Sequence, residues 1–138
     1  MIDFLPPIEH RIVVDDNSDY YMVIDSKSIA KEVYTVDKVM QTYDSAWVYV
    51  LYTAPYIPYT LDEYQNNAIA FNKYKLVVNC DTYQSAFYTM YNYDSEGNVV
   101  VASELNTGNN LQQSDFSNIS KGSIGDIQAK IMCEALSF

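Results

Sequence analysis

The sequence contains few of the residues on which most catalytic and metal sites depend. Of its 138 residues, one is histidine, two are cysteine and four are glycine. His10 lies beside Arg11 in a segment that follows two prolines, so a catalytic triad would rest on a poorly anchored residue. Two cysteines and one remote histidine do not supply the four ligands of a structural zinc site, and neither GxGxxG nor a P-loop is present. We therefore predict a protein that is not an enzyme, with no catalytic residues, no metal and no cofactor.

Basic residues are also scarce, with eight lysines and arginines against eighteen aspartates and glutamates and a net charge of −10. This balance disfavours nucleic acids and anionic lipids as partners, and it favours solubility or a cationic partner. No apolar run approaches the roughly 18 residues that span a bilayer, and the N-terminal sequence MIDFLPPIEHR lacks the basic and apolar regions of a signal peptide. We expect no membrane span, and if the protein is exported, its signal peptide is absent from this sequence.

Aromatic and β-branched residues, in contrast, are abundant. Fourteen tyrosines and five phenylalanines, together with runs of valine and isoleucine, favour strands over most of the chain. The length suits one domain with a substantial core, and no linker-like stretch divides it. We predict the α+β class, with an N-terminal arm and acidic turn over residues 1–19 and a single domain over residues 20–138.

The C-terminal segment is the one convincing amphipathic helix. Ser123 is a good N-cap and Asp126 follows it three positions later, so the helix is predicted to begin at about Ile124. An apolar stripe is expected to face the sheet, because a helix of about 13 residues is marginal alone and must bury one side. The stripe consists of Ile124, Ile127, Ile131 and Ala135, widened by Met132 and Leu136. We place Cys133 at its border.

Several segments have strand composition: residues 20–25, 46–53, 71–80 and 83–93, the last joined by a turn at residues 94–98 to a strand over residues 99–103. In the third segment Tyr74, Leu76 and Val78 alternate with polar residues, which predicts that they and Cys80 share the buried face.

The order of the sheet is less fully specified. Residues 46–53 are apolar on both sides and are predicted to form a central strand. Residues 33–40 alternate as an outer strand, and residues 43–45 are predicted to turn the chain. Residues 105–120 are polar, with Leu111, Phe116 and Ile119 as anchors, and are interpreted as an irregular loop with at most a short strand.

Residues 54–67 are predicted to form a loop, because Pro55 and Pro58 cannot continue a strand ladder. This loop would expose Tyr56, Tyr59 and Tyr64. Tyrosine offers a large apolar surface and a hydroxyl group with little entropy to lose, so these three residues are candidates for contact with a protein partner. The strand tyrosines, among them Tyr74, Tyr83, Tyr88, Tyr91 and Tyr93, are predicted to be structural.

An acidic segment near the N-terminus resembles half of a calcium-binding loop. Asp15, Asn17 and Asp19 have the required spacing, but Tyr20 stands where glycine is needed and Ser26 where the bidentate glutamate is needed. We interpret the segment as an acidic turn.

Four stretches together resemble the bacterial surface-adhesin E family. They are YYMVIDSKSI at 20–29, AWVYVLY at 46–52, VVNCDTYQSAFYTMYNYDSEGNVVVAS at 77–103 and ISKGSIGDIQAKIMCEAL at 119–136. The order of IDxxSI, strand cysteine, YDxxG hairpin and a GS-initiated helix with a late cysteine carries the resemblance, which covers most of the chain beyond residue 19.

The resemblance implies a twisted antiparallel sheet of about six strands, with the C-terminal helix packed on one face and tied to it by a disulfide between Cys80 and Cys133. It also implies an exported, non-enzymatic envelope protein, in the periplasm or at the outer-membrane or cell surface, with lipid anchoring left open. Family members include adhesins that bind host matrix and plasma proteins, and a homodimer is one form to expect. The basic segments of those adhesins have no obvious counterpart here.

Other interpretations stay open at this point. The net charge of −10 also suits an inhibitor that captures a basic secreted enzyme such as a lysozyme. A periplasmic structural or small-ligand protein is a third hypothesis. Two buried free cysteines in a cytosolic protein are the alternative to the disulfide.

Overall fold

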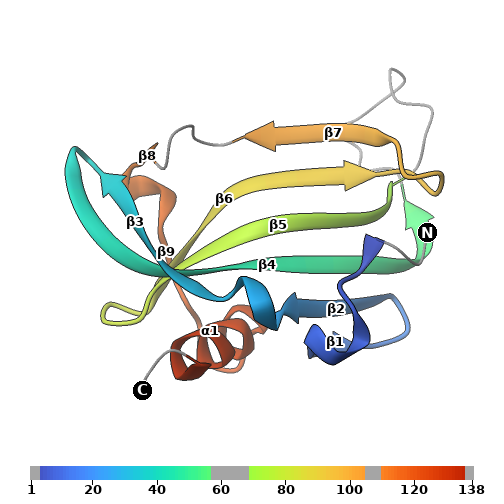
Figure 1. Ribbon diagram of the computed structural model, residues 1–138, viewed down its shortest axis with the longest axis horizontal. Helices are drawn as coiled ribbons and strands as arrows, with labels where there is room; N and C mark the ends of the chain where they lie inside the picture. The colour runs from blue at the N-terminus through green and yellow to red at the C-terminus, as the bar shows by residue number, and fades with distance from the viewer. Residues whose placement is uncertain (1–3, 57–68, 105–109, 136–138) are drawn as a thin grey trace.

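The computed structural model describes residues 4–56, 69–104 and 110–135, and a twisted antiparallel sheet dominates them (Figure 1). The main strands are β1 (Arg11–Asp16), β2 (Tyr20–Asp25), β3 (Ala30–Val36), β4 (Val39–Tyr56), β5 (Ile69–Asn79), β6 (Gln84–Tyr93) and β7 (Val99–Glu104). The short elements are β8 (Asn110–Leu111), β9 (Ser117–Asn118) and the 3-10 helices η2 (Ile8–His10), η3 (Ser26–Ser28) and η5 (Gln113–Asp115). The α-helix α1 spans Ile124–Ala135. No helix in the described ranges has the length and apolar character needed to cross a bilayer.

The main path of the sheet has the order β1-β2-β4-β5-β6-β7, with every neighbouring pair antiparallel. The path agrees with the expected sheet of about six strands, and β3, β8 and β9 raise the total among the described residues to nine. Strand β4 is central because its first part pairs with β3 and its later part lies between β2 and β5. The predicted α+β class, the strands near residues 20–25, 71–80 and 83–93, and the hairpin at Gly97 are confirmed.

The start of helix α1 is as predicted. The Ser123 hydroxyl accepts a hydrogen bond from the Asp126 amide at 3.1 Å, which satisfies one of the unpaired N–H groups of the first turn. The Asp126 carboxylate accepts from the Gly122 amide at 2.8 Å, and Gly122 has a φ of 81° that favours glycine. The chain therefore enters the helix through a turn that its own side chains close.

The side of α1 that faces the sheet differs from the predicted stripe. Its buried residues are Asp126, Gln128, Ala129 and Met132. Ile127 is 39% exposed and Ala135 is exposed, whereas Ile124 and Ile131 are partly buried at the border. The helix is therefore rotated about its axis relative to the predicted orientation. Gln128 can be buried against the sheet because its side chain donates a hydrogen bond to the Tyr74 hydroxyl at 2.7 Å. Leu136 lies outside the described residues.

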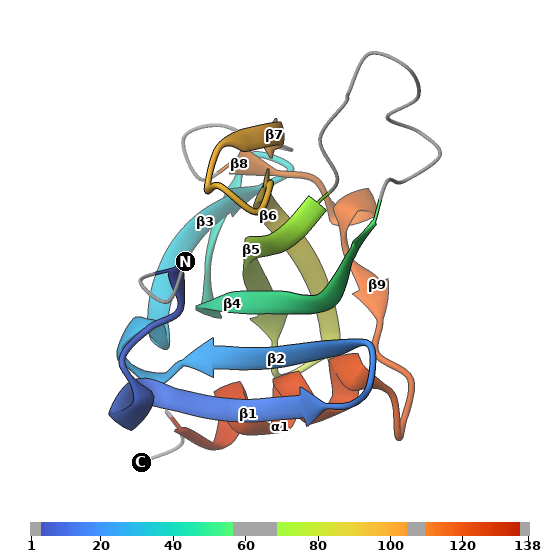
Figure 2. The same cartoon turned by 90° about the vertical axis from the view of Figure 1, so that its right-hand side faces the viewer.

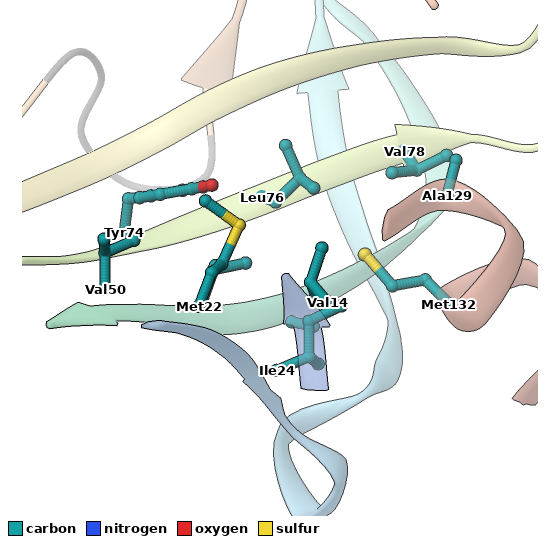
Figure 3. Packing of buried hydrophobic residues seen from close by; sticks show 11 residues of the cluster. Val14, Met22, Ile24, Val50, Tyr74, Leu76, Val78, Ala129 and Met132 are labelled. Atoms are coloured by element: carbon teal, nitrogen blue, oxygen red, sulfur yellow. The ribbon is translucent and has the colours of Figure 1, made fainter. Parts of the chain in front are cut away.

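The main hydrophobic core lies between this helix face and the sheet, as Figure 3 shows. Alternate residues of four neighbouring strands point toward α1, and Tyr74, Leu76 and Val78 are buried there as predicted. The cluster consists of Val14, Met22, Ile24, Ala46, Val48, Val50, Tyr74, Leu76, Val78, Ala129 and Met132. The helix thus covers one face of the sheet, in contact with β1, β4 and β5.

A second, smaller core lies on the other face, where the β3–β4 hairpin folds over β5 and β6. It contains Tyr34, Val36, Tyr43, Val77, Ala86, Leu111 and Phe116. The predicted turn at residues 43–45 is wrong, because β4 runs without a break from Val39. The chain instead turns at Asp37 and Lys38, whose φ angles of 48° and 71° give a tight two-residue hairpin loop.

A disulfide joins Cys80 to Cys133, with their Cα atoms 6.0 Å apart. The pairing implied by the resemblance is therefore confirmed, and the alternative of two free cysteines is wrong. The predicted burial of Cys80 is also wrong: Cys80 is exposed, because β5 ends at Asn79 and the cysteine follows in a turn. The bond fixes α1 to the end of a central strand.

The stability of the helix start should depend on pH through Asp126. A hydrogen bond from the Tyr83 hydroxyl, together with the Gly122 amide and Lys130 at 3.3 Å, lowers the pKa of Asp126 from 3.8 to about 2. A lowered pKa means that the ionised carboxylate stabilises the fold above about pH 4 and that this contribution is lost as the pH falls toward 2. Urea unfolding of wild type and Asp126→Asn should differ most above pH 4 and converge toward pH 2.

The matched control is Asp81→Asn, which removes an exposed carboxylate from the turn after β5. As a surface change, it should alter the unfolding free energy by less than about 0.5 kcal/mol. A difference between wild type and Asp126→Asn that does not change between pH 5 and 2 would contradict this role of Asp126.

Candidate functional site

The sheet face opposite α1 carries a row of aromatic and basic side chains from the three central strands. The register places Tyr49 of β4 and Tyr91 of β6 on either side of Lys73 of β5. Two residues before Lys73 on β5, Phe71 lies between Leu51 and Tyr93. Two residues after Lys73, Lys75 lies between Trp47 and Thr89. We call Trp47, Tyr49, Phe71, Lys73, Lys75, Tyr91 and Tyr93 the aromatic–lysine face.

At one end of this face three rings form an aromatic box that the N-terminal arm fills. The ring centroid of Phe4 lies 4.0 Å from that of Phe71 and 5.4 Å from those of Tyr49 and Tyr93. Figure 2 shows the arm running up from β1 to the level of β4. Because edge and tilted ring contacts add to the burial of apolar area, Phe4 anchors the arm to the sheet.

In the middle of the face, the ammonium group of Lys73 lies over two rings. Its Nζ atom is 5.1 Å from the centroid of Trp47 and 5.8 Å from that of Tyr91, and these two rings stack at 6.4 Å. A cation over the faces of aromatic rings is held by their negative π-electron density. Lys73 is therefore positioned on the face while remaining partly exposed.

Lys75 is held differently, by a carboxylate. Its Nζ atom lies 2.7 Å from Glu32 of β3, and it also lies 6.0 Å from the ring centroid of Tyr88. Burial by itself would raise the pKa of Glu32, but hydrogen bonds from Lys75 and from the Ser45 hydroxyl hold it below its ordinary value. Glu32 is thus ionised at neutral pH and neutralises Lys75. Of the two lysines on this face, Lys73 has no carboxylate within 4.0 Å among the described residues.

A comparison with solved structures aligns the chain with a crystal structure of Haemophilus influenzae protein E (crystal form II). The alignment covers 96% of this chain and 94% of that chain, with a TM-score of 0.52 and 16% sequence identity. The chain has the fold of protein E. No protein-family model matches the sequence, and no curated protein matches it. The resemblance noted in the sequence is confirmed at the level of the protein E fold.

The tyrosines predicted as a contact site are only partly within the described residues. Tyr56 is the last residue of β4, where its backbone pairs with Ile69, so it ends a strand and does not lie in a loop. The register of the β4–β5 pair is irregular between Leu51 and Tyr56, and this irregular stretch accommodates Pro55. Tyr59 and Tyr64 lie outside the described residues.

The acidic segment forms the turn between β1 and β2. The side-chain oxygen Oδ1 of Asn17 accepts from the backbone amides of Asp19 and Tyr20 at 2.7 and 3.0 Å, and the Asp15 carboxylate accepts from the Tyr20 hydroxyl at 2.8 Å. These side chains close the turn in the manner of an Asx-turn. This agrees with the interpretation as an acidic turn.

One further carboxylate lies beside the disulfide. Asp44 is buried on β4, with its Oδ2 atom 3.3 Å from Cys80 Sγ and its Oδ1 atom 3.0 Å from Lys31 Nζ. The two sulfur atoms near Asp44 are bonded to each other, so neither is a thiolate that could ligate a metal. Lys31 accounts for the charge of Asp44.

Sequence reasoning missed the aromatic–lysine face as a site. The alternation of Trp47 and Tyr49, and that of Lys73 and Lys75, is visible in the sequence. What joins them is the register of β4 with β5 and β6, together with the return of Phe4 to this face. A signal that could have pointed to it is the placement of two lysines on a strand that is otherwise mostly apolar, in a chain with only eight basic residues.

Proposed function

We propose that this chain is a non-enzymatic, adhesin-like binding domain of a bacterial envelope, and that it contacts another protein, with host matrix and plasma proteins as the first candidates. The observation that carries the proposal is the aromatic–lysine face. Tryptophan and tyrosine dominate the energetics of protein interfaces because they bury a large area and retain a polar group. The face offers such side chains on a surface that α1 leaves uncovered.

The scaffold under this face is rigid, which supports a binding role. β4, β5 and β6 have ladder partners on both sides, so the backbone that positions the face is held by hydrogen bonds along each strand. The disulfide and the main core brace the same strands from the opposite side. A preorganised surface loses less conformational entropy when a partner binds.

The proposal includes an exported location, and the disulfide supports it. Disulfides persist in oxidising compartments such as the periplasm and the cell surface and are rare in the cytosol. Lipid anchoring and a homodimer belong to the same proposal. A fusion of the full gene product to a reporter that is active only outside the cytosol would test the location.

Tyr56, Tyr59 and Tyr64 remain part of the proposed contact surface, because their segment continues from β4, the strand that carries Trp47 and Tyr49. The double change Tyr56→Ala with Tyr59→Ala should reduce capture of immobilised matrix proteins about thirtyfold or more, given that aromatic interface residues each contribute on the order of 1–2 kcal/mol. Surface plasmon resonance on a panel of immobilised host matrix and plasma proteins measures this.

The control for that experiment is Tyr20→Ala with Tyr83→Ala, which removes two partly buried tyrosines that pack against the main core on the α1 side of the sheet. Both double variants must retain the wild-type near-UV spectrum. Equal capture by wild type and the Tyr56 and Tyr59 variant would remove this segment from the proposed surface.

A second candidate function is an acidic inhibitor of a basic secreted enzyme, which the net charge of −10 favours. The two functions differ in their dependence on salt. Raising the salt from about 0.05 to 0.5 M should weaken inhibitor binding more than roughly tenfold, because screening removes long-range attraction between oppositely charged proteins. Contact led by aromatic rings should change less than about threefold, and partner binding with a flat salt profile would contradict the inhibitor hypothesis.

A further inference from the structure

The box formed by Tyr49, Phe71 and Tyr93 is occupied by a residue that comes from outside the sheet. The arm that precedes β1 runs from this edge strand toward the central strands (Figure 2), and its residue Phe4 contacts Phe71 there. Its ring is partly exposed, so it fills the box without being enclosed. The box therefore accommodates an aromatic side chain that enters from solvent.

The arm that delivers Phe4 is held by a small number of polar contacts. Among the described residues, these are the hydrogen bond from Arg11 Nε to the Pro6 carbonyl at 2.7 Å and the one from the His10 amide to the Pro7 carbonyl at 2.8 Å. Both lie within the arm and its junction with β1, and neither joins the arm to β4, β5 or β6. Leu5 is partly buried and Pro6 is buried, so the arm has apolar contacts besides those of Phe4. Phe4 is the ring that occupies the box, and it is this ring that a competing aromatic side chain needs to replace.

Lys73 lies two residues from Phe71 on the same face of β5, with its ammonium group over Trp47, and the rest of the described chain does not neutralise its charge. Lys31, Lys75 and Lys130 each have a carboxylate within 4.0 Å, whereas Lys73 has none among the described residues. Lys73 instead lies over the rings of Trp47 and Tyr91. An ammonium group with no carboxylate within 4.0 Å among the described residues is available for an anionic group of a partner.

We propose that the box and Lys73 together form a binding site for an extended peptide segment of a partner protein. The segment carries an aromatic residue at one position and an aspartate or glutamate two positions away. Phe71 and Lys73 are two residues apart on the same face of β5, and such a pair is about 7 Å apart along a strand. An extended peptide presents positions i and i+2 on one side at the same spacing, so its ring enters the box while its carboxylate meets Lys73.

This inference rests on the proposed binding function. It adds the chemistry of the partner segment, and it identifies Phe4 as a competitor within the chain. Phe4 occupies the aromatic part of the site in the free protein, and the partner residue displaces it. The arm therefore weakens binding of any single peptide and favours partners that also contact the surrounding face.

The probe is the acetylated and amidated pentapeptide Gly-Phe-Thr-Asp-Gly, titrated into the full chain and followed by isothermal calorimetry and by fluorescence of Trp47, the sole tryptophan. Phe4→Ala should bind it about tenfold more tightly than wild type, because removal of the competing ring frees the box. Lys73→Met should bind it about threefold to fivefold more weakly than wild type, as for loss of a partly exposed ion pair. Trp47 fluorescence should change on binding, because the Trp47 ring lies under Lys73.

Matched controls separate the two parts of the site. Lys121→Met removes an exposed lysine from the turn before α1 and should bind like wild type. The peptide with alanine in place of phenylalanine should lose binding, and the peptide with asparagine in place of aspartate should bind wild type and Lys73→Met equally. Phe4→Leu, which retains apolar packing without a ring, should fall between wild type and Phe4→Ala, and it keeps the test valid if the alanine variant unfolds.

Three results would overturn the inference. The first is equal binding of the phenylalanine and alanine peptides to Phe4→Ala, and the second is unchanged binding to Lys73→Met. The third is a wild-type dimer in sedimentation that Phe4→Ala dissociates, since the box would then hold the arm of a second copy. Capture of matrix proteins distinguishes this inference from the broader proposal: capture without peptide binding refutes the site alone, and peptide binding without capture refutes the adhesin-like function alone.

Discussion

Replacing both cysteines by serine, Cys80→Ser with Cys133→Ser, should lower the free energy of unfolding by about 4 kcal/mol. The bridge joins residues 53 positions apart, and its removal restores the freedom of that loop in the unfolded chain. The total stability of a domain of this size is typically about 5–15 kcal/mol, so a large fraction would be lost. Urea unfolding of the oxidised wild type and the double variant, followed by circular dichroism, measures the difference.

Two comparisons test whether the loss comes from the bond. Wild type treated with a reducing agent should unfold at the same urea concentration as the double variant, and the double variant should not respond to the reducing agent. Hydrogen exchange should show the largest loss of protection in α1, because the bond attaches this helix to the end of β5. A loss below about 1 kcal/mol would mean that packing alone holds the helix.

The parts of the fold that were predictable have strong local signals. The segments that became β2, β5 and β6 are rich in β-branched and aromatic residues, and Gly97 marks the hairpin with a φ of 88° that few other residues adopt. Ser123 specifies the start of α1 through a hydrogen bond within one turn. In each case the residues that decide the structure lie close together in the sequence.

The β3–β4 hairpin had no such signal. A two-residue hairpin loop with two positive φ angles usually contains glycine or asparagine, and here Asp37 and Lys38 occupy it. The loop is supported from a distance, since the Asp37 amide donates to the Leu111 carbonyl at 3.1 Å and its carboxylate accepts from the Gln113 amide at 3.1 Å. Contacts over more than seventy residues are not visible in a local pattern.

The orientation of α1 shows a second reason why sequence patterns do not predict the whole fold. The spacing of apolar residues predicts that the side of α1 with Ile127 is buried. In the structure the buried side contains Ala129, whose small side chain permits close approach of the helix to the sheet, and Gln128, which donates to the Tyr74 hydroxyl. Buried polar groups are tolerated when they are paired, and the partner can be identified only in three dimensions. The aromatic–lysine face is a case of the same kind, because Phe4, Phe71 and Lys73 meet through strand register and the path of the arm.

The orientation of the helix makes a second large prediction, for Met132. This side chain is fully buried between α1 and the sheet (Figure 3), so Met132→Ala should leave a cavity and lower the free energy of unfolding by about 2–5 kcal/mol. Ile127→Ala is the matched control: it removes a similar volume from a side chain that is 39% exposed, and alanine is the better helix former. Its cost should stay below about 1 kcal/mol in the same urea experiment. If Ile127→Ala proved the more costly change, the helix would present the stripe that its apolar spacing suggests, and the contact between Gln128 and Tyr74 would not form.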